Sequence, residues 1–565
     1  MAPAKEKPGA ALRQLEALKD EYGGDAASRK LRLIRLLDRS RLVRASEVAR
    51  LHETLCFLRA YPDDREILTG VDEALFRFDE RKDLRRHREA LVNSGIAGTP
   101  IDFPFYWFTA SWLARRWPDR LSVDWPVFER KSWLDKRFLA LMPYCETLAL
   151  EETSLPIREW VERLKGPDET DATFLIRRFE ALRADPLARE LFYQELDVPC
   201  RLAPGPSTPT RSRARYAAAP IVFQKRPPVR SRSGFRAEID RPPRAVRSLP
   251  PREAQAVIDL AREAMVTRHR DLDVFVHGDR RDVRMIDCGG GLQFACIGAT
   301  PEWRQMLDVV YGFLMIRNGM PIGYVLCSAL FGSAEVAFNV FDAYRGSEAA
   351  HLFGRSLAIV RHLFRTDAFV LDPYQLGYEN REGQKSGAWW FYYKLGFRPR
   401  DPEILRLVRA ELAKLKRNPR YRSSPSTLND LAAENMYLFL GRPRDDVVGV
   451  FSRDNVGFRV IRYLAERFGG RREAGIRSCS REAARLLVLR SRSDLTAGER
   501  VAWDRWSPLV MALPGVERWS RAERTALARV VRAKGGRRES EFVHLFDRHR
   551  RLRRAILELA NRPPD

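Results

Sequence analysis

Hydrophobic residues recur at spacings of three and four through the first two hundred positions of the chain. Two series show this period, one within residues 33–37 and one within residues 48–58. Such spacing places side chains on one face of an α-helix that packs against a core. Breaks containing Pro or Gly occur at residues 61–64 and 95–100. The pattern predicts a helical N-terminal domain over residues 1–200, in which we find no chemical motif.

From about residue 252 the pattern changes to helices alternating with short apolar runs. Residues 254–266 have helical spacing, and two strand candidates, 283–288 and 292–297, are joined by three consecutive glycines. Two further runs, 311–316 and 322–330, meet at Asn318-Gly319. Glycine adopts positive φ freely, and Asn-Gly is a strong hairpin signal. We therefore predict two β-hairpins in this region.

A third apolar run, residues 336–341, is almost continuous, which favours a central strand buried on both faces. The apolar residues from Ala349 to Phe364 then share one helical face, and we expect Arg355 and Arg361 to point away from it. A strand at 368–371, a helix at 384–395, an inserted helix and a last strand at 436–440 complete an α/β domain over residues 252–441.

The segments on either side of this domain differ from it in composition. Residues 201–251 are rich in Pro and Arg, which is typical of a linker, although a basic arm that contacts nucleic acid would have the same composition. Residues 442–565 have helical spacing again. One helix is expected to end at Gly469-Gly470, and Ser520-x-x-Glu523 is a capping box that predicts the start of another, ending at Gly535.

Composition narrows the class of protein. The most apolar run, residues 103–114, is shorter than the roughly 20 residues that span a bilayer, so we expect no membrane span. No apolar signal segment follows Met1, and the seven cysteines form no CxxC pair. These features indicate a cytoplasmic protein without structural metal.

The net charge of +25 indicates a basic surface, which is either a solvated exterior or a surface that attracts RNA or DNA. The arginine-rich stretch 548–554 leaves the same two alternatives open.

The order of elements in the α/β domain resembles the GCN5-related N-acetyltransferase (GNAT) superfamily. Two stretches carry the resemblance, VAFNVFDAYRGSEAAHLFGRSLAIVR from residue 336 and SGAWWFYYKLGFRP from residue 386. The resemblance implies a mixed α/β (α+β) sheet with helices on both faces, flanked here by N- and C-terminal helical domains. It covers about residues 252–441 and does not extend to the flanks.

The first stretch is similar to the strand, loop and helix with which this superfamily binds acyl-CoA. The loop pattern is Gln/Arg-x-x-Gly-x-Gly/Ala, and a helix N-terminus suits a pyrophosphate because its backbone N–H groups are unpaired. Here Glu348 replaces the central glycine and would repel phosphate. The alternative is an ordinary helix N-terminus. The resemblance implies that acetyl-CoA or another acyl-CoA contacts the following residues: Asn339, Val340, Phe341, Arg345, Gly346, Ser347, Glu348, Ala349 and Ala350.

The second stretch implies catalytic residues. Tyr392 matches the tyrosine that protonates the departing CoA thiolate, although one of five clustered aromatic residues can equally be part of the core. Asn380 resembles an asparagine found before this helix, at a longer spacing. Glu335, at the start of the central strand, is the candidate general base.

Our leading hypothesis is an N-acyltransferase that moves an acyl group from acyl-CoA to an amine on a protein or small molecule, with aminoacyl-tRNA as an alternative donor. The rival is a catalytically inactive GNAT-like protein that acts as a basic nucleic-acid-binding or interaction module. A structural interaction protein is a third hypothesis. The sequence leaves the acceptor, the acyl group and the oligomeric state open.

Overall fold

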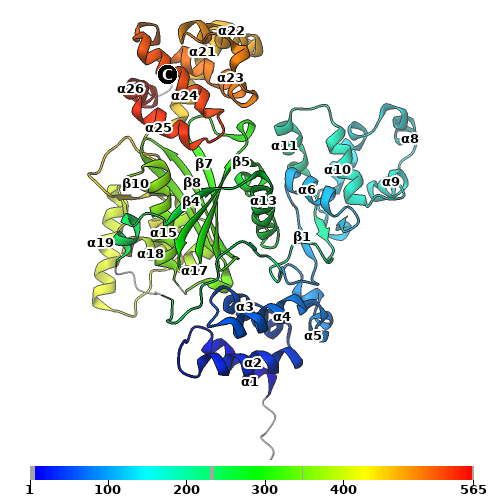
Figure 1. The fold of residues 1–565 in the computed structure, drawn as a ribbon. Coiled ribbons are helices and arrows are strands. Elements are labelled where there is room, and N and C mark those ends of the chain that lie inside the picture. Colours follow the sequence, from blue (N-terminus) through cyan, green and yellow to red (C-terminus); the bar gives the residue numbers. More distant parts are fainter. Residues whose placement is uncertain (1–6, 229–233, 347, 563–565) are drawn as a thin grey trace, which may run out of the picture. The chain divides into compact units, whose positions relative to one another are not determined.

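The computed structural model describes residues 7–228, 234–346 and 348–562 (Figure 1). The chain forms two compact units. Unit 1 comprises Met1–Pro227, Val257–Val276 and Arg317–Pro321, and unit 2 comprises Pro228–Ala256, His277–Ile316 and Ile322–Asp565. Each unit is therefore assembled from segments that are far apart in the sequence.

The first part of unit 1 is helical, as the hydrophobic spacing predicts. Its helices are α1 (Pro8–Leu18), α2 (Ala26–Arg39), α3 (Ala45–Ala60), α4 (Arg65–Phe76) and α5 (Lys82–Arg86). In the two apolar series of the sequence, the side chains of Leu33 and Leu37 on α2 and of Leu51 and Leu55 on α3 are buried.

The second part of unit 1 combines helices with a small sheet that the sequence pattern does not predict. Strands β1 (Ile101–Phe103), β2 (Leu121–Val123) and β3 (Cys200–Leu202) form an antiparallel sheet in the order β1-β3-β2. A strand of three residues is too short to show a period-two pattern. The helices here are α6 (Trp107–Arg116), α7 (Lys131–Arg137), α8 (Thr147–Glu152), α9 (Ile157–Leu164), α10 (Asp171–Ala181) and α11 (Pro186–Leu196).

The apolar run at 103–114 is divided between β1 and α6, and the aromatic side chains of α6 pack in the core of this part. None of the helices in the described part of the chain has both the length and the hydrophobicity that crossing a membrane requires.

Much of the Pro- and Arg-rich segment 201–251 is packed. Ser212 is buried, its Oγ accepts a hydrogen bond from the Ala97 N–H (2.9 Å), and it lies 2.8 Å from His52 Nε2. Later in the segment are helix α12 (Phe235–Asp240) and strand β4 (Ala245–Ser248), which belong to unit 2. Residues 229–233 lie outside the described residues.

Unit 2 is built on a nine-stranded mixed sheet in the order β11-β12-β10-β9-β8-β7-β6-β5-β4. β8 pairs antiparallel with β9, β9 pairs parallel with β10, and β12 lies between β10 and β11. The remaining strands are β5 (Gly278–Gly289), β6 (Leu292–Ala299), β7 (Val309–Arg317), β8 (Met320–Leu330), β9 (Ser333–Val340), β10 (Ala368–Leu371), β11 (Arg398–Pro399) and β12 (Met436–Phe439).

Both predicted hairpin turns are confirmed. Gly289 pairs with Leu292 at the end of β5 and β6, and the intervening glycines have φ of 63° and 80°. Asn318 and Gly319, between β7 and β8, have φ of 48° and 83°, as a type I′ turn requires.

Helix α15 (Ala349–Phe364) covers one face of the sheet. Phe353 packs on Phe338 of β9 (ring centroids 5.0 Å apart) and Phe364 on Tyr311 of β7 (5.3 Å). The prediction of a central strand is correct, but burial alternates along it instead of being continuous. Even-numbered residues of β9 are buried beneath α15, whereas Glu335, Ala337 and Asn339 on the opposite face are half-buried.

The expectation that Arg355 points away from the core is wrong. This side chain is 1% exposed, and its guanidinium donates to the carbonyl oxygens of Glu238 (3.0 Å), Arg241 (2.6 Å) and Pro242 (3.2 Å) at the end of α12. The helix period cannot reveal this role, because the acceptors come from a segment more than a hundred residues earlier. Arg361, by contrast, is half-buried and pairs with Asp240.

The helix predicted at 384–395 is two helices. Helix α17 (Arg381–Ser386) ends at Gly387, and α18 (Ala388–Lys394) begins after it. Gly387 has a φ of 70°, so it cannot continue an α-helix and the chain changes direction there. Two further helices near the sheet are α16 (Pro373–Leu376) and α20 (Pro425–Leu431), with α19 (Pro402–Arg417) between strands β11 and β12.

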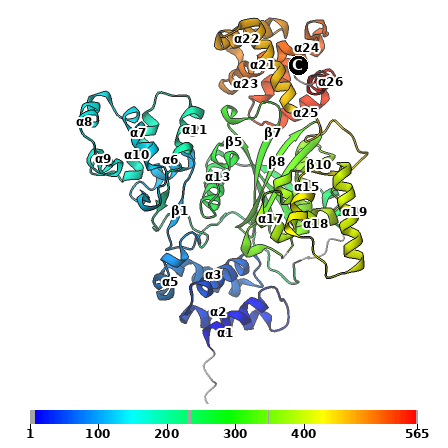
Figure 2. The same ribbon diagram turned by 180° about the vertical axis from the view of Figure 1, so that it is seen from behind.

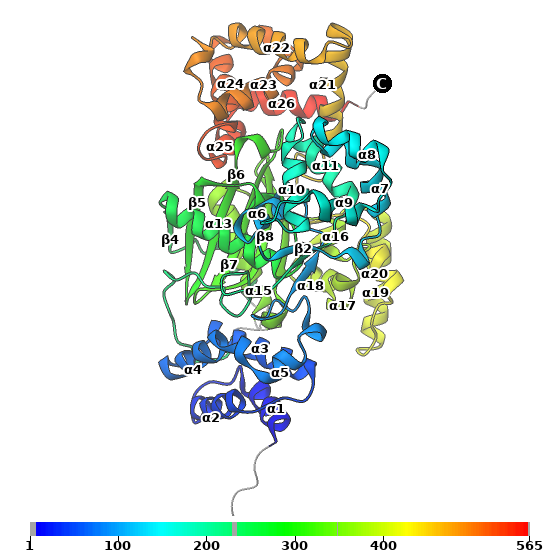
Figure 3. The same cartoon turned by 90° about the vertical axis from the view of Figure 1, so that its right-hand side faces the viewer.

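The C-terminal helices of unit 2 gather at one end of the sheet (Figures 2 and 3). They are α21 (Arg453–Phe468), α22 (Arg472–Leu486), α23 (Ala497–Ala512), α24 (Arg521–Lys534), α25 (Ser540–Arg548) and α26 (Arg550–Ala560). The predicted capping box at Ser520 and Glu523 is formed, and α24 ends at Gly535.

A buried cluster of charged groups joins these helices to the sheet. Lys534 pairs with Glu539 (2.6 Å) and donates to the Asp308 carbonyl oxygen (2.6 Å), while Arg304 donates to the Lys534 carbonyl oxygen (2.8 Å). Two more helices, α13 (Pro251–Val266) and α14 (Asp273–Val276), complete the fold.

Candidate functional site

The central strand β9 loses its neighbour halfway along its length. Its parallel pairing with β10 extends only from Ser333 to Glu335, opposite Ala368–Val370. β10 ends at Leu371, whereas β9 continues to Val340, so the two strands form a wedge. A strand edge without a neighbour has N–H and C=O groups that must find other partners.

Gln375 of α16 occupies this wedge and supplies those partners. Its Oε1 accepts a hydrogen bond from the Phe338 N–H (3.2 Å), and its Nε2 donates to the Phe338 carbonyl oxygen (3.0 Å). The carboxamide therefore pairs with one residue of β9 as the peptide group of a neighbouring strand would. Gln375 is not predictable from the sequence, because no pattern in the chain distinguishes it from any other polar residue in a loop.

Tyr392 of α18 lies beside the same strand edge. Gln375 Nε2 lies 2.5 Å from its hydroxyl oxygen, and its ring packs edge-on against Phe353 (5.2 Å). The side chain is buried, and this burial raises the pKa of the Tyr392 hydroxyl well above its usual range. The hydroxyl therefore stays protonated at neutral pH, and the raised pKa makes it a weaker proton donor than an ordinary tyrosine. Tyr392 thus belongs both to the core and to the wedge.

Glu335 lies at the point where the wedge begins, on the face of β9 opposite α15. Burial raises the pKa of its carboxyl above the usual value, and the negative charge of Asp372 adds to this increase. The positive charge of Arg453 lowers the pKa of Glu335, and the negative charge of Asp308 raises it. A carboxyl with a raised pKa is a better proton acceptor near neutral pH than an ordinary one.

Asp308 and Arg453 were not identified from the sequence. Asp308 is buried, accepts a hydrogen bond from Ser328 Oγ (2.8 Å) and forms an ion pair with Arg453 at the start of α21. The C-terminal helices thus contribute a charged group beside Glu335. Asn339 lies on the same face of β9 two pleats along, and its Oδ1 is buried without a hydrogen-bond partner within the described part of the chain.

The predicted phosphate loop contains more negative than positive charge. Arg345 Nε donates to the Val340 carbonyl oxygen (2.9 Å), and its guanidinium forms ion pairs with Asp342 (2.7 Å) and Glu382. Glu348 occupies the position before the first turn of α15 and is buried. A pyrophosphate bound here would compete with carboxylates for the guanidinium of Arg345.

The other predicted cofactor contacts lie as follows. Gly346 has a φ of 80° and open space around its Cα, Ser347 lies outside the described residues, and Ala349 and Ala350 form the first turn of α15. The Phe341 N–H donates to the Ile322 carbonyl oxygen (2.9 Å).

Asn380 caps helix α17. Its Oδ1 accepts from the Gly383 N–H (3.0 Å), and its Nδ2 donates to the Tyr374 carbonyl oxygen (3.0 Å). These bonds give Asn380 a structural role that needs no cofactor.

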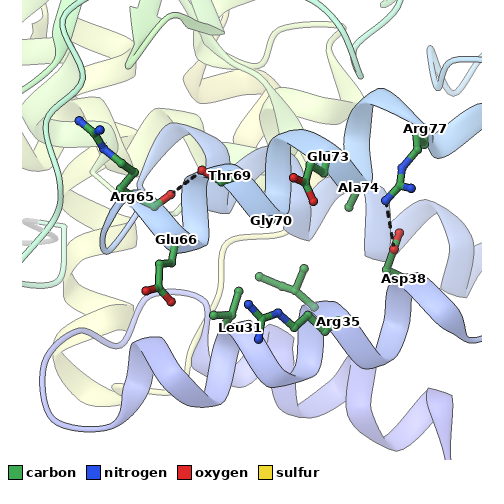
Figure 4. A pocket seen from close by; sticks show the side chains of 11 residues that line it. Leu31, Arg35, Asp38, Arg65, Glu66, Thr69, Gly70, Glu73, Ala74 and Arg77 are labelled. Atoms are coloured by element: carbon green, nitrogen blue, oxygen red, sulfur yellow. Dashed lines mark hydrogen bonds and ion pairs between the residues drawn. The ribbon is translucent and has the colours of Figure 1, made fainter.

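Unit 1 has a separate concavity between helices α2 and α4 (Figure 4), with a volume of about 570 Å³. Leu31, Gly70 and Ala74 are among its small or apolar lining residues, and charged side chains surround them, including the ion pair between Arg77 and Asp38 (3.6 Å). Both signs of charge are present, so the groove has no clear preference for an anion or a cation.

In residues 7–228, 234–346 and 348–562 there is no group of three or more His, Cys, Asp or Glu side chains arranged to hold a metal ion. Comparison of the chain with known protein families, curated proteins and solved structures finds no match.

Proposed function

We propose that unit 2 contains a GNAT-like N-acyltransferase domain that moves an acyl group from acyl-CoA to an amine. One observation carries the proposal: a wedge between two parallel strands, with a protonated tyrosine at the unpaired strand edge and a carboxyl of raised pKa where the wedge begins. The resemblance places the pantetheine arm of the donor in such a wedge. The connection of β9 to β10 through α15 agrees with the strand, loop and helix order that carries the resemblance.

We assign the two proton transfers of this reaction to two residues of the wedge. The acceptor nitrogen attacks the carbonyl carbon of the thioester and forms a C–N bond, while the C–S bond breaks. Glu335 accepts the proton that the nitrogen loses, and the Tyr392 hydroxyl gives its proton to the departing thiolate. The products are an amide and free CoA, and the two side chains return to their starting states by proton exchange with water.

A second candidate function rests on a different observation. The two carboxylates paired with Arg345, together with Glu348 at the start of α15, favour a GNAT-like domain that does not bind acyl-CoA and acts as a basic nucleic-acid-binding or interaction module. The two candidates differ in one measurable property, the affinity for acyl-CoA.

Isothermal titration with acetyl-CoA and longer acyl-CoAs tests the proposal. We expect binding that Arg345→Glu weakens at least tenfold, because the substitution removes the only cation among the phosphate-loop residues that we name. Arg361→Glu is the matched control, since it makes the same charge change on helix α15, outside the loop that contains Arg345. Absence of binding, or equal weakening by both substitutions, would contradict the acyltransferase proposal and favour the second candidate.

If acyl-CoA binds, release of free CoA in the presence of amines tests catalysis. Tyr392→Phe removes the proton donor and Glu335→Gln the proton acceptor, and each should lower kcat by 100-fold or more, on the order of general acid–base contributions, while acyl-CoA affinity changes little.

A further inference from the structure

The positive charge of the protein is concentrated in its C-terminal helical region. Residues 442–565 contain 29 of the Lys and Arg residues and 16 of the Asp and Glu residues, a net charge of +13 out of +25 for the whole chain. Only one of the 29 is a lysine. Arginine presents a planar fork of donors that matches a phosphate or carboxylate group, so this composition suits an anionic partner.

The arginine-rich stretch 548–554 is partly engaged within the protein. Arg553 pairs with Asp446 (2.7 Å), and the guanidinium of Arg551 lies over the ring of Trp519 (5.8 Å). Helix α22 is different. Arg477, Arg481 and Arg485 are all exposed and recur every fourth residue.

The geometry of α22 directs these three arginines away from the protein. Gly475, Cys479 and Ser480 are on its buried side, and the Trp503 indole N–H of α23 donates to the Ser480 carbonyl oxygen (3.2 Å). Each arginine follows a buried position by two residues, which is a rotation of about 200° around the helix. The three side chains therefore lie along one outward face, in a row about 12 Å long at 1.5 Å per residue.

Within the part of the chain that the structure describes, the three arginines of the row form no close ion pairs, although the positive charge of Arg485 helps to lower the pKa of the neighbouring Glu482. Among the described residues, no ion pair within 4.0 Å joins Arg477, Arg481 or Arg485 to an acidic side chain, although the neighbouring Arg467 pairs with Glu482 (2.7 Å). Like charges four residues apart on a helix repel one another and destabilise it. A ligand with regularly repeated negative charge would relieve this repulsion.

We propose that the arginine row of α22 binds the phosphodiester backbone of a nucleic acid without reading its sequence. An anionic membrane surface is the less suitable partner, because the small and apolar side of α22 is buried against α23 and cannot insert into lipid. This inference is independent of the proposed acyltransferase reaction, since it concerns a different part of unit 2.

Fluorescence anisotropy with a labelled 20-nucleotide single-stranded RNA, and with the corresponding DNA duplex, tests the proposal across a salt series from 50 to 200 mM. The test variant replaces Arg477, Arg481 and Arg485 with Gln. The matched control replaces Arg158, Arg183 and Arg409 with Gln, which removes the same charge from exposed positions elsewhere. Circular dichroism checks that both variants keep their helices.

We expect the native protein to bind, with an affinity that falls as salt rises. The α22 variant should lower the slope of log Kd against log salt concentration by about 2–3, because each phosphate contact contributes slightly less than one unit. The control variant should keep the native slope. Equal losses in the two variants, no binding by the native protein, or equal binding of the native protein and the α22 variant would each overturn the proposal. Stronger α22-dependent binding to phosphatidylserine vesicles than to RNA or DNA would also overturn it and assign the row to membranes.

Discussion

The wedge of unit 2 depends on one side chain, and Gln375→Ala tests this dependence. The substitution removes two hydrogen bonds to the Phe338 backbone and one contact with the Tyr392 hydroxyl. A net contribution of about 0.5–1.5 kcal/mol for each bond predicts a loss of about 2–3 kcal/mol in the free energy of unfolding, since water reaches part of the vacated space. The backbone groups of Phe338 would then bond to water or remain unpaired.

Two measurements check this magnitude. Urea unfolding followed by tryptophan fluorescence gives the change in stability, and hydrogen exchange of peptides that cover β9 reports the Phe338 amide. Tyr392→Phe removes only the third bond and should cost about 1 kcal/mol. In the double variant the two losses should not add fully, because the substitutions share one hydrogen bond. A stability change below 0.5 kcal/mol for Gln375→Ala, with unchanged exchange at Phe338, would refute the structural reasoning.

The same substitution separates the two candidate functions. If the pantetheine arm enters the wedge, Gln375 competes with it for the Phe338 backbone. Gln375→Ala should then tighten acetyl-CoA binding, by up to about tenfold for a free-energy change near 1.4 kcal/mol. If the domain does not bind acyl-CoA, the substitution lowers stability and creates no affinity.

Three further predictions concern the folded state of each unit. Burial beside two aspartates raises the pKa of Glu190 to about 7 in the folded state, above its unfolded value of 4.5. The stability of unit 1 should therefore fall as pH rises from 5 to 8. In urea titrations Glu190→Gln should flatten this dependence on pH, whereas Glu195→Gln on the same helix should not. Arg355→Leu leaves three carbonyl oxygens unpaired and should cost about 3 kcal/mol in urea unfolding, against less than 1 kcal/mol for Arg361→Leu, whose partly exposed side chain makes one ion pair. Ser520→Ala removes a helix cap and should cost about 1 kcal/mol by the same assay, and a loss below 0.3 kcal/mol would contradict the capping role.

Local signals in the sequence predicted local structure well. The Asn318-Gly319 turn, the glycine-joined hairpin and the Ser520 capping box follow from the conformational preferences of a few adjacent residues, and all three are present. The division of the predicted helix at Gly387 was missed, because a single glycine inside a helical pattern does not by itself require positive φ.

The candidate site was only partly predictable. The resemblance led to Tyr392 and Glu335, which lie at the wedge, and to Arg345, whose charge is already paired with carboxylates. It did not lead to Gln375 or Arg453, because their roles arise from contacts with strand and loop segments 37 and 145 residues away.

The sequence by itself determined most helices of the flanks, the two hairpins, the central strand with the helix that follows it, and the excess of positive charge, because each follows from hydrophobic period, turn residues or composition. Only the tertiary structure decided which side chains fill the wedge, that Arg355 is buried, and which arginines remain exposed and unpaired. These outcomes depend on how segments distant in the chain pack together, and the hydrogen bonds and ion pairs formed there satisfy buried polar groups that no local pattern can match with their partners.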